Sequence, residues 1–287
     1  MLYLVLTTLC GALVTIALRY AEGHFSSKTG MLAMNYLTCF IGVGAFVGHG
    51  NILPGVTGGI PGVTAADGLL TVGLGALSGF LYMAALLLLQ YNVEKSGVIL
   101  ASVFQKLGLM VTVIGSILFF GEEPGVMQFG GLVFAIAGII LINYEKGHLR
   151  NAFKPMLLIL LVVDGCGMGM LKVYNEVGVP ELEDHFLFFN FFFACLFCLI
   201  ETAWKREKIS GRDVLHGISI GAPNFLASRF LLMALETVPA IIAYPTRGVA
   251  VIVCVSIAGI FLFKEHLVKR QWIAMALVMT AIVLLNV

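Results

Sequence analysis

The segment FFGEEPGVMQ at residues 119–128 returns, in altered form, as LFKEHLVKRQ at residues 262–271. One fixed offset aligns the two copies without a gap, and the matching register extends over residues 94–143 and 237–286. The polar matches are the most informative, because apolar segments often align by chance. These polar matches are Glu122 with Glu265, Gln128 with Gln271, and Asn143 with Asn286. The segment therefore indicates that the chain contains an internal duplication.

Weaker matches extend the duplication toward the start of each half. Asp67 aligns with Asp213, and Asn35 aligns with Asn190. Both halves are hydrophobic throughout, and a duplicated hydrophobic chain is typical of a membrane transporter.

The composition indicates that the solvent of this chain is lipid. Of its 287 residues, 60% are hydrophobic and only 11% are charged, with a mean hydropathy of +1.01. Soluble domains carry about 25% charged residues, so a surface this poor in charge would not stay in water. A net charge of +1 without any basic run argues against nucleic acid as a partner. The cysteines all lie in apolar segments, which favours packing residues over disulfides or metal ligands.

The hydrophobic pattern predicts an all-α integral membrane protein with ten transmembrane helices. A span needs about 20 mostly apolar residues, and charges, glycine and proline mark the gaps between spans. Five spans in each half is an odd number, so the second half enters the membrane inverted relative to the first, and such folds place the substrate centrally between the halves. We expect repeats at residues 1–147 and 148–287. The predicted spans are 2–20, 30–48, 67–90, 97–120, 126–144, 154–175, 185–204, 212–237, 240–263 and 269–287.

Lysine and arginine in the loops predict the orientation of this multi-pass protein in the cell membrane. Alternate loops hold thirteen of these residues, and the loops on the other side, together with both termini, hold none. The positive-inside rule then places both termini outside the cytoplasm.

The two copies of the repeated segment also resemble a known family. In each copy an apolar helix leads to a glutamate in a tight loop (Glu122, Glu265), a glutamine at the start of the next helix (Gln128, Gln271) and a further apolar helix. This pattern resembles the EamA-type repeat of the drug/metabolite transporter superfamily. The resemblance implies ten helices in two inverted five-helix repeats, a central cavity lined by the first four helices of each repeat, and peripheral fifth and tenth helices. It also implies cytoplasmic termini, in contrast to the charge count.

Several charged residues lie inside the predicted spans. A charge at the centre of a bilayer costs at least about 2.5–3.5 kcal/mol, so each of these residues needs a partner or a function. None of them lies in the two spans that the resemblance places at the periphery. The residues are Lys106, Asp164, Lys172, Arg229 and Arg247.

Lys106 and Arg247 are predicted to bind substrate. Lys106 lies about 15 Å into its span, and Ser102 shares its helix face one turn earlier. Arg247 follows Pro245, a residue that can kink a helix, and shares a face with Tyr244. A guanidinium offers a planar fork for carboxylate or phosphate. The alternatives are a Lys106 side chain that snorkels to water and a structural ion pair at Arg247.

Arg229 and Asp164 have two interpretations of equal weight. Asp164 is the single mid-span carboxylate, so the two residues form a structural pair, or Arg229 binds substrate and Asp164 acts in coupling or gating. Asn224, close to Arg229 in the same span, is a further candidate for substrate binding. Lys172 lies near the end of its span and is predicted to snorkel to water.

The uncharged polar candidates are Asn35, Asn190 and Tyr82. The two asparagines are expected either to line the cavity or to form hydrogen bonds between helices. Glu122 and Glu265 are expected to cap or brace the helices that follow them, as structural loop residues.

The balance of buried charge favours an anionic substrate. If Arg229 and Asp164 cancel, Lys106 and Arg247 remain, and a cavity with unpaired cations requires an anion. We therefore predict a secondary transporter of a small organic metabolite with a carboxylate or phosphate group, working by alternating access. Its partners would be that metabolite, the lipid bilayer, and protons or a counter-substrate.

Two alternatives remain. The first is an exporter of amino acids or neutral solutes, in which the buried basic residues form structural ion pairs. The second is an intramembrane enzyme, which is disfavoured because the histidines lie in loops or near span ends and Gly-x-Ser-x-Gly and His-Glu-x-x-His motifs are absent. No cofactor, metal or nucleotide site is predicted.

Overall fold

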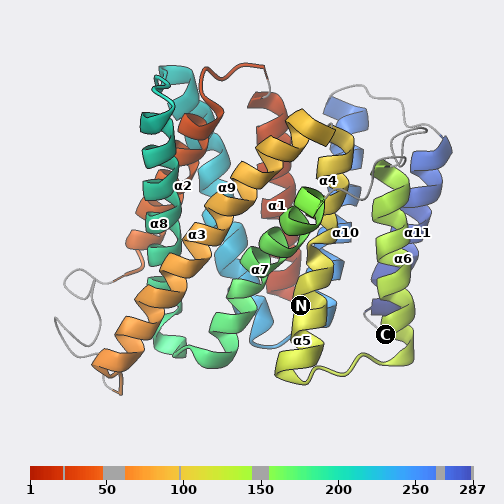
Figure 1. Ribbon diagram of the computed structural model, residues 1–287. Coiled ribbons are helices and arrows are strands. Elements are labelled where there is room, and N and C mark those ends of the chain that lie inside the picture. Colours follow the sequence, from red (N-terminus) through yellow and green to blue (C-terminus); the bar gives the residue numbers. More distant parts are fainter. Residues whose placement is uncertain (22, 48–61, 97, 144–154, 263–268, 286–287) are drawn as a thin grey trace.

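The computed structural model describes residues 1–21, 23–47, 62–96, 98–143, 155–262 and 269–285, and these ranges are helical apart from short connections (Figure 1). The elements are α1 (Leu2–Ala21), α2 (Lys28–Gly44), α3 (Ala65–Ser96), α4 (Val98–Leu107), α5 (Leu109–Phe120), α6 (Val126–Asn143), α7 (Pro155–Val177), η2 (Pro180–Leu182), α8 (Glu183–Trp204), α9 (Gly211–Leu235), α10 (Ala240–Leu262) and α11 (Lys269–Leu285).

The helices have the length and apolar composition of membrane spans. Within the described residues, six are individually long and apolar enough to cross a bilayer: α1, α3, α7, α8 together with η2, α9 and α10. Shorter apolar helical segments cover Phe104–Phe120 and Val126–Gly138. The chain is therefore an all-α, multi-pass membrane protein, as predicted.

One predicted span is broken. The span expected at residues 97–120 consists of α4 and α5, which meet at Gly108. The amide of Gly108 donates to the carbonyl oxygen of Gln105 at 3.0 Å, one residue closer along the chain than in a regular α-helix. The reason for the break lies on α7, because a Cβ added at Gly165 would stand 2.2 Å from the carbonyl oxygen of Gly108. The two backbones approach closely here, and only glycine allows this contact.

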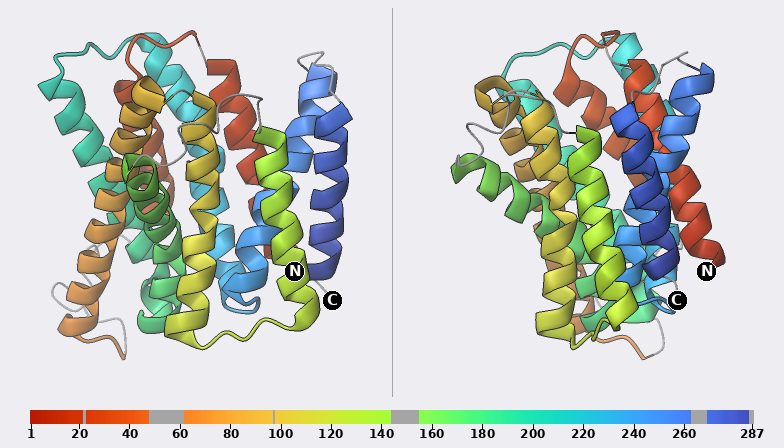
Figure 2. Two further views of the ribbon diagram at one scale, coloured as in Figure 1. Left: turned by 45° about the vertical axis from the view of Figure 1, so that its right-hand side comes forward. Right: turned by 90° about the vertical axis from the view of Figure 1, so that its right-hand side faces the viewer.

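The packing pattern of the helices is that of two inverted repeats. Figure 2 shows α6 and α11, the last helix of each repeat, side by side at one edge of the bundle. When α1, α2, α3, α4 with α5, and α6 are matched to α7, α8, α9, α10 and α11, each major contact has a counterpart. Helix α3 packs on α8 as α9 packs on α2, and α1 packs on α9 as α7 packs on α3. Helices α6 and α11 pack against each other. The described start of α1 and the described end of α11 lie at the same end of the bundle (Figure 1). The expected repeat boundary at residues 147/148 falls outside the described residues.

The repeated aspartates explain how two equivalent helices begin. Asp67 and Thr64 form reciprocal hydrogen bonds at the start of α3, where the Thr64 amide donates to Asp67 Oδ2 at 2.9 Å. Asp213 and Ser210 form the same capping box at the start of α9, with the Ser210 amide donating at 2.7 Å. A capping box satisfies amides that have no partner within the helix. The match between Asp67 and Asp213 therefore reflects local structure.

Glycines allow the close contacts between the halves. A Cβ at Gly79 on α3 would lie 2.8 Å from the amide nitrogen of Ala194 and 2.8 Å from the carbonyl oxygen of Asn190, both on α8. We therefore expect Gly79→Ala to separate α3 from α8 and to lower the free energy of unfolding by about 2 kcal/mol. Gly73→Ala is the matched control on the same helix, because a Cβ there meets no atom within 4 Å.

Thermal unfolding of both glycine variants in detergent measures this difference. If Gly79→Ala and Gly73→Ala melt at the same temperature, the two backbones are not in contact as described.

Candidate functional site

A cavity of about 1120 Å³ lies between the two repeats. Its described lining residues come from α1 to α4, from α7 to α10 and from the connection after α1, that is, from the first four spans of each half. The cavity extends from mid-helix residues such as Asp164 to the exposed side chains of Arg19 and Lys28. We call the end of the bundle with Arg19 and Lys28 the mouth end. We call the end with the described start of α1 and the described end of α11 the closed end.

The described lining of the cavity carries an excess of positive charge. Arg19 and Lys28 lie at the mouth end, and Lys106 and Arg247 lie deeper, whereas Asp164 is the only acidic residue among the described lining residues. Charges in a low-dielectric site interact strongly and are costly to leave without partners. The charged side chains of the described lining are therefore net positive.

Arg247 is held in place from the opposite half of the protein. Its Nε donates to Oγ1 of Thr7 on α1 at 3.0 Å. The Thr7 hydroxyl in turn donates to the carbonyl oxygen of Ala227 on α9 at 2.6 Å. Arg247 itself lies on α10 two residues after Pro245, which is accommodated within the helix. The Thr7 hydroxyl thus connects three helices, α1, α9 and α10.

Lys106 and Asp164 lie beside the break between α4 and α5. Gln105 Nε2 donates to Asp164 Oδ1 at 3.2 Å, and a Cβ at Gly108 would stand 3.1 Å from Asp164 Oδ2. Lys106 lies two residues before Gly108, and its side chain is accessible from the cavity. The broken helix therefore places the amide of Gln105 next to the only acidic residue among the described lining residues.

Aromatic rings form part of the remaining described wall. The rings of Tyr36 and Tyr82 are stacked with centroids 6.4 Å apart, and the rings of Tyr36 and Phe191 are also 6.4 Å apart. The Tyr244 hydroxyl donates to the carbonyl oxygen of Met168 at 2.9 Å, which joins α10 to α7. Such rings combine apolar contact area with a polar tip.

The structure brings together six of the predicted site residues in this cavity: Lys106, Arg247, Tyr244, Tyr82, Asn224 and Asp164. The helix that contains Ser102 is described, but the side chain of Ser102 is outside the described part. Glu265 is outside the described residues altogether.

Arg229 lies elsewhere. Its Nη2 donates to Asp184 Oδ2 at 3.0 Å, its Nε lies 3.0 Å from Oδ1, and its guanidinium stacks on Phe46 at 3.7 Å. The interpretation in which Arg229 pairs with Asp164 is therefore wrong. Arg229 is also not among the described lining residues of the cavity.

The two predicted asparagines are packed between helices rather than exposed in the cavity. Asn35 is buried and accepts a hydrogen bond from Asn224 Nδ2 at 3.2 Å. Asn190 is fully buried, and within the described residues neither atom of its amide group has a hydrogen-bond partner. Asn35 thus joins α2 to α9, and through Asn224 it contacts a lining residue.

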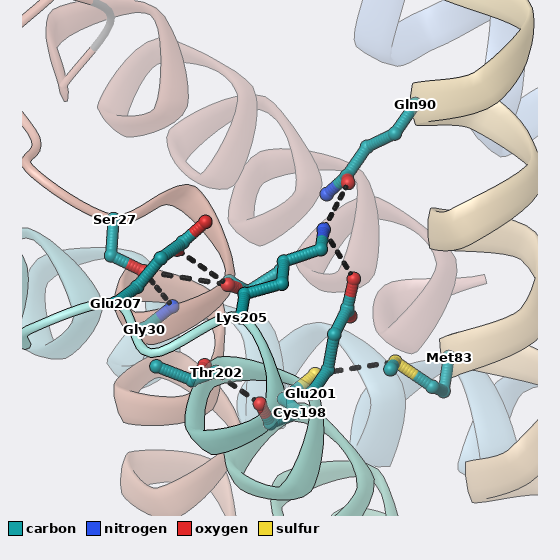
Figure 3. A network of polar contacts seen from close by, with 10 residues as sticks. Ser27, Gly30, Met83, Gln90, Cys198, Glu201, Thr202, Lys205 and Glu207 are labelled. Carbon is teal, nitrogen blue, oxygen red and sulfur yellow. Dashed lines mark hydrogen bonds and ion pairs between the residues drawn. The ribbon is translucent and has the colours of Figure 1, made fainter.

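Polar contacts connect helix ends at the mouth end (Figure 3). Lys205 at the end of α8 pairs with Glu201 at 2.6 Å and donates to Gln90 of α3 at 3.1 Å. The Ser27 hydroxyl, before α2, donates to Glu207, in the connection from α8 to α9. These contacts fix α2, α3 and α8 to one another beside the cavity.

A largely buried carboxylate joins helices at the closed end. Glu122, with an 11% exposed side chain, accepts the amides of Ala240 and Ile241 at 2.8 Å each and lies 2.9 Å from Lys172 Nζ. Lys172 also pairs with Glu176. Glu122 therefore caps α10 and not the helix that follows it. The prediction that Lys172 snorkels to water is wrong, because its side chain is only 6% exposed.

Sequence reasoning missed Thr7, and also Arg19, Lys28 and Tyr36 as lining residues. Thr7 is one of several small polar residues in an apolar span, and its contact with Arg247 joins residues 240 positions apart. No local pattern marks such a contact. The loop-charge pattern predicts a side of the membrane for Arg19 and Lys28, but it does not predict their place in the cavity.

An inverted pair of helical repeats around a central charged cavity defines a membrane transporter. The EamA-like transporter family model matches residues 1–144 and 156–287, so the chain belongs to this family, within the drug/metabolite transporter superfamily. An uncharacterized protein of Haemophilus influenzae (strain ATCC 51907 / DSM 11121 / KW20 / Rd) is 24% identical over 71% of this chain and 72% of its own length. A protein crystal structure with 15% sequence identity superposes with a TM-score of 0.71 over 99% of this chain and 96% of the other, which supports the fold. The family match confirms the predicted transporter and overturns the enzyme alternative.

Proposed function

We propose that this protein is a secondary transporter for a small organic anion with a carboxylate or phosphate group. The observation that carries the proposal is the cavity between the repeats, whose described lining contains Lys106 and Arg247 at depth, Arg19 and Lys28 at the mouth end, and a single carboxylate. A guanidinium and an ammonium bind such anions by charge-assisted hydrogen bonds. The aromatic wall suits the organic part of the substrate.

The proposed mechanism is alternating access between the two repeats. The mouth end carries Arg19, Lys28 and Lys205, which belong to the basic loops, so the positive-inside rule would place this end in the cytoplasm and both chain termini outside. In this state the substrate would enter from the cytoplasmic side, while Glu122 and Lys172 keep the other end closed. Movement of one repeat against the other would then break these contacts and form new ones at the mouth end. Protons or a counter-substrate would drive the cycle.

A thermal-shift screen of the purified protein tests the substrate class. The panel comprises phosphate esters, carboxylates, amino acids, neutral sugars and quaternary amines, and a bound compound raises the melting temperature by mass action. We expect anions to stabilise the protein. In Lys106→Gln the concentration needed for the same stabilisation should rise about tenfold, because one charge-assisted hydrogen bond is lost.

Lys95→Gln is the matched control, since Lys95 is not among the described lining residues. Stabilisation by neutral or cationic compounds alone, with no effect of Lys106→Gln, would contradict the anion proposal.

A second candidate is a transporter of amino acids. It is favoured by one observation, namely that Asp164 lies in the cavity with Gln105 and that Arg229 pairs with Asp184 instead. Asp164 would then bind the substrate ammonium while Arg247 binds its carboxylate. In the same screen, Asp164→Asn would weaken stabilisation by amino acids and leave stabilisation by simple carboxylates unchanged.

A further inference from the structure

One face of α1 follows the cavity from the guanidinium of Arg247 to the mouth end. Thr7, Gly11, Thr15 and Leu18 recur at spacings of three and four residues, so they share one face of the helix. Thr15 and Leu18, together with Arg19, line the cavity. Thr7 is completely buried behind this lining, at the point where α1 meets α9 and α10.

The hydrogen bonds of Thr7 have a fixed direction. A hydroxyl has one hydrogen to donate, and Thr7 donates it to the carbonyl oxygen of Ala227 at 2.6 Å. Its lone pairs therefore accept the Nε–H of Arg247, at 3.0 Å. The bond uses one of the five N–H groups of the guanidinium. Because Nε, Cζ and the terminal nitrogens are coplanar, fixing the direction of the Nε–H group also limits where the terminal nitrogens can lie.

Gly11, one turn further along α1, leaves room for the other side of the same guanidinium. A Cβ at Gly11 would stand 3.3 Å from the terminal nitrogen Nη2 of Arg247 and 3.1 Å from a methyl carbon of Val251. Both distances are tighter than an ordinary contact, so a methyl group there would push against Nη2. Thr7 thus holds Arg247 by a hydrogen bond at Nε, and the missing side chain of Gly11 leaves the space that Nη2 occupies.

We propose that Thr7 and Gly11 are positioning residues for the anion site, which hold the guanidinium of Arg247 in the orientation that binds the substrate anion. The proposal rests on the proposed function, because it assigns these residues to the anion site. It makes α1 of the first repeat a determinant of affinity for a ligand bound by α10 of the second repeat.

Phenyl phosphate serves as the probe, since it joins a phosphate to an aromatic ring of the kind that the tyrosines of the cavity would contact. Its binding to the full-length protein in detergent is measured by thermal shift, with benzyl alcohol as the neutral comparison. Thr7→Val, which retains the shape of the side chain, should raise the dissociation constant about tenfold, as expected for a lost hydrogen bond to a charged group. Thr7→Ser should restore binding to within about twofold of the wild-type protein, because the hydroxyl is retained.

Thr8→Val is the matched control. Thr8 is a buried threonine on the same helix, but its hydroxyl donates to Leu4 of its own helix at 2.7 Å. This variant should bind phenyl phosphate as the wild-type protein does.

A second readout does not depend on any ligand. The exchange rate of the Arg247 Nε–H with solvent is measured by nuclear magnetic resonance of ¹⁵N-arginine-labelled protein, with the signal assigned by its loss in Arg247→Lys. Thr7→Val should accelerate this exchange about tenfold, in proportion to the lost bond, and Thr8→Val should not change it. Gly11→Ala should weaken phenyl phosphate binding while the Nε–H remains protected, and it tests the proposal even if Thr7→Val fails to fold.

The outcomes separate the two proposals. The role of Thr7 would be overturned if Thr7→Val left the exchange rate of the Arg247 Nε–H unchanged. It would also be overturned if Thr7→Val accelerated the exchange but left phenyl phosphate binding unchanged, while Arg247→Ala weakened that binding. Wild-type binding of phenyl phosphate by Arg247→Ala would instead overturn the anion site itself.

Discussion

Arg247→Ala should reduce transport of the anionic substrate at least about 100-fold, because it removes both the charge and the fork of a guanidinium in a low-dielectric cavity. Apart from Arg19 and Lys28 at the mouth end, the charged residues of the described lining would then be Lys106 and Asp164, whose charges cancel. The loss is measured as uptake into proteoliposomes of the anion that stabilises the wild-type protein most strongly in the screen. We expect the Michaelis constant to rise and the thermal stabilisation by that anion to disappear.

Two arginine variants control for this result. Arg247→Lys keeps the charge but not the planar fork, so its transport should be intermediate. Arg229→Ala removes an arginine that binds Asp184 and Phe46 and is not among the described lining residues. It should lower stability but leave the Michaelis constant unchanged. Wild-type kinetics in Arg247→Ala would remove Arg247 from the site.

The contrast between Arg247 and Arg229 shows what the sequence determines. Hydropathy gives the depth of a residue in its span, and the cost of a buried charge shows that it needs a partner. Depth does not give the direction in which a helix presents a side chain to its neighbours. Arg229 and Asp164 are both mid-span, yet the partner of Arg229 is Asp184 at the start of α8, a residue that the sequence placed in a loop.

The fold was more predictable than the site. The alternation of apolar spans with charged loops gave the ten spans, and the odd number of spans per half gave the inversion. The break at Gly108 was not predicted, because it depends on the approach of Gly165 from another helix. Likewise, the contact of Glu122 with the start of α10 depends on how the two repeats face each other. The position of Glu122 in the sequence predicts instead that it caps the helix that follows it.

Glu122→Gln should both destabilise the protein and open its closed end. Glu122 caps α10 of the second repeat and pairs with Lys172 of α7, and both side chains are largely buried. Loss of one partner from a buried ion pair costs about 3 kcal/mol when the other charge is left alone. Lys172 keeps its pair with Glu176, so we expect a smaller but clear fall in thermal stability. Glu123→Gln is the matched control, because Glu123 is the adjacent glutamate and is exposed.

Opening is measured with a cysteine placed at Val238, which is buried at the closed end next to the start of α10. In a background without the native cysteines, a membrane-impermeant maleimide should label Val238→Cys slowly in the otherwise wild-type chain. Labelling should be about tenfold faster with Glu122→Gln, in proportion to the weaker closed state. The double variant Glu122→Gln with Lys172→Met should recover part of the stability, because it also removes the buried charge that Glu122 pairs with.

These measurements distinguish a contact that closes one end from a contact that only stabilises the fold. A purely structural role predicts lower stability with the same slow labelling in Glu122→Gln, because the closed end would still be packed in every folded molecule. A role in alternating access predicts faster labelling in Glu122→Gln. It also predicts a change in the apparent affinity for substrate measured from the mouth end, because a shift toward one state changes the fraction of binding-competent protein. Glu122 lies far along the chain from Arg247, but Glu122 caps α10, the helix that contains Arg247. Any movement of α10 that releases the Glu122 cap therefore also moves the guanidinium of Arg247, and this connection is what alternating access requires.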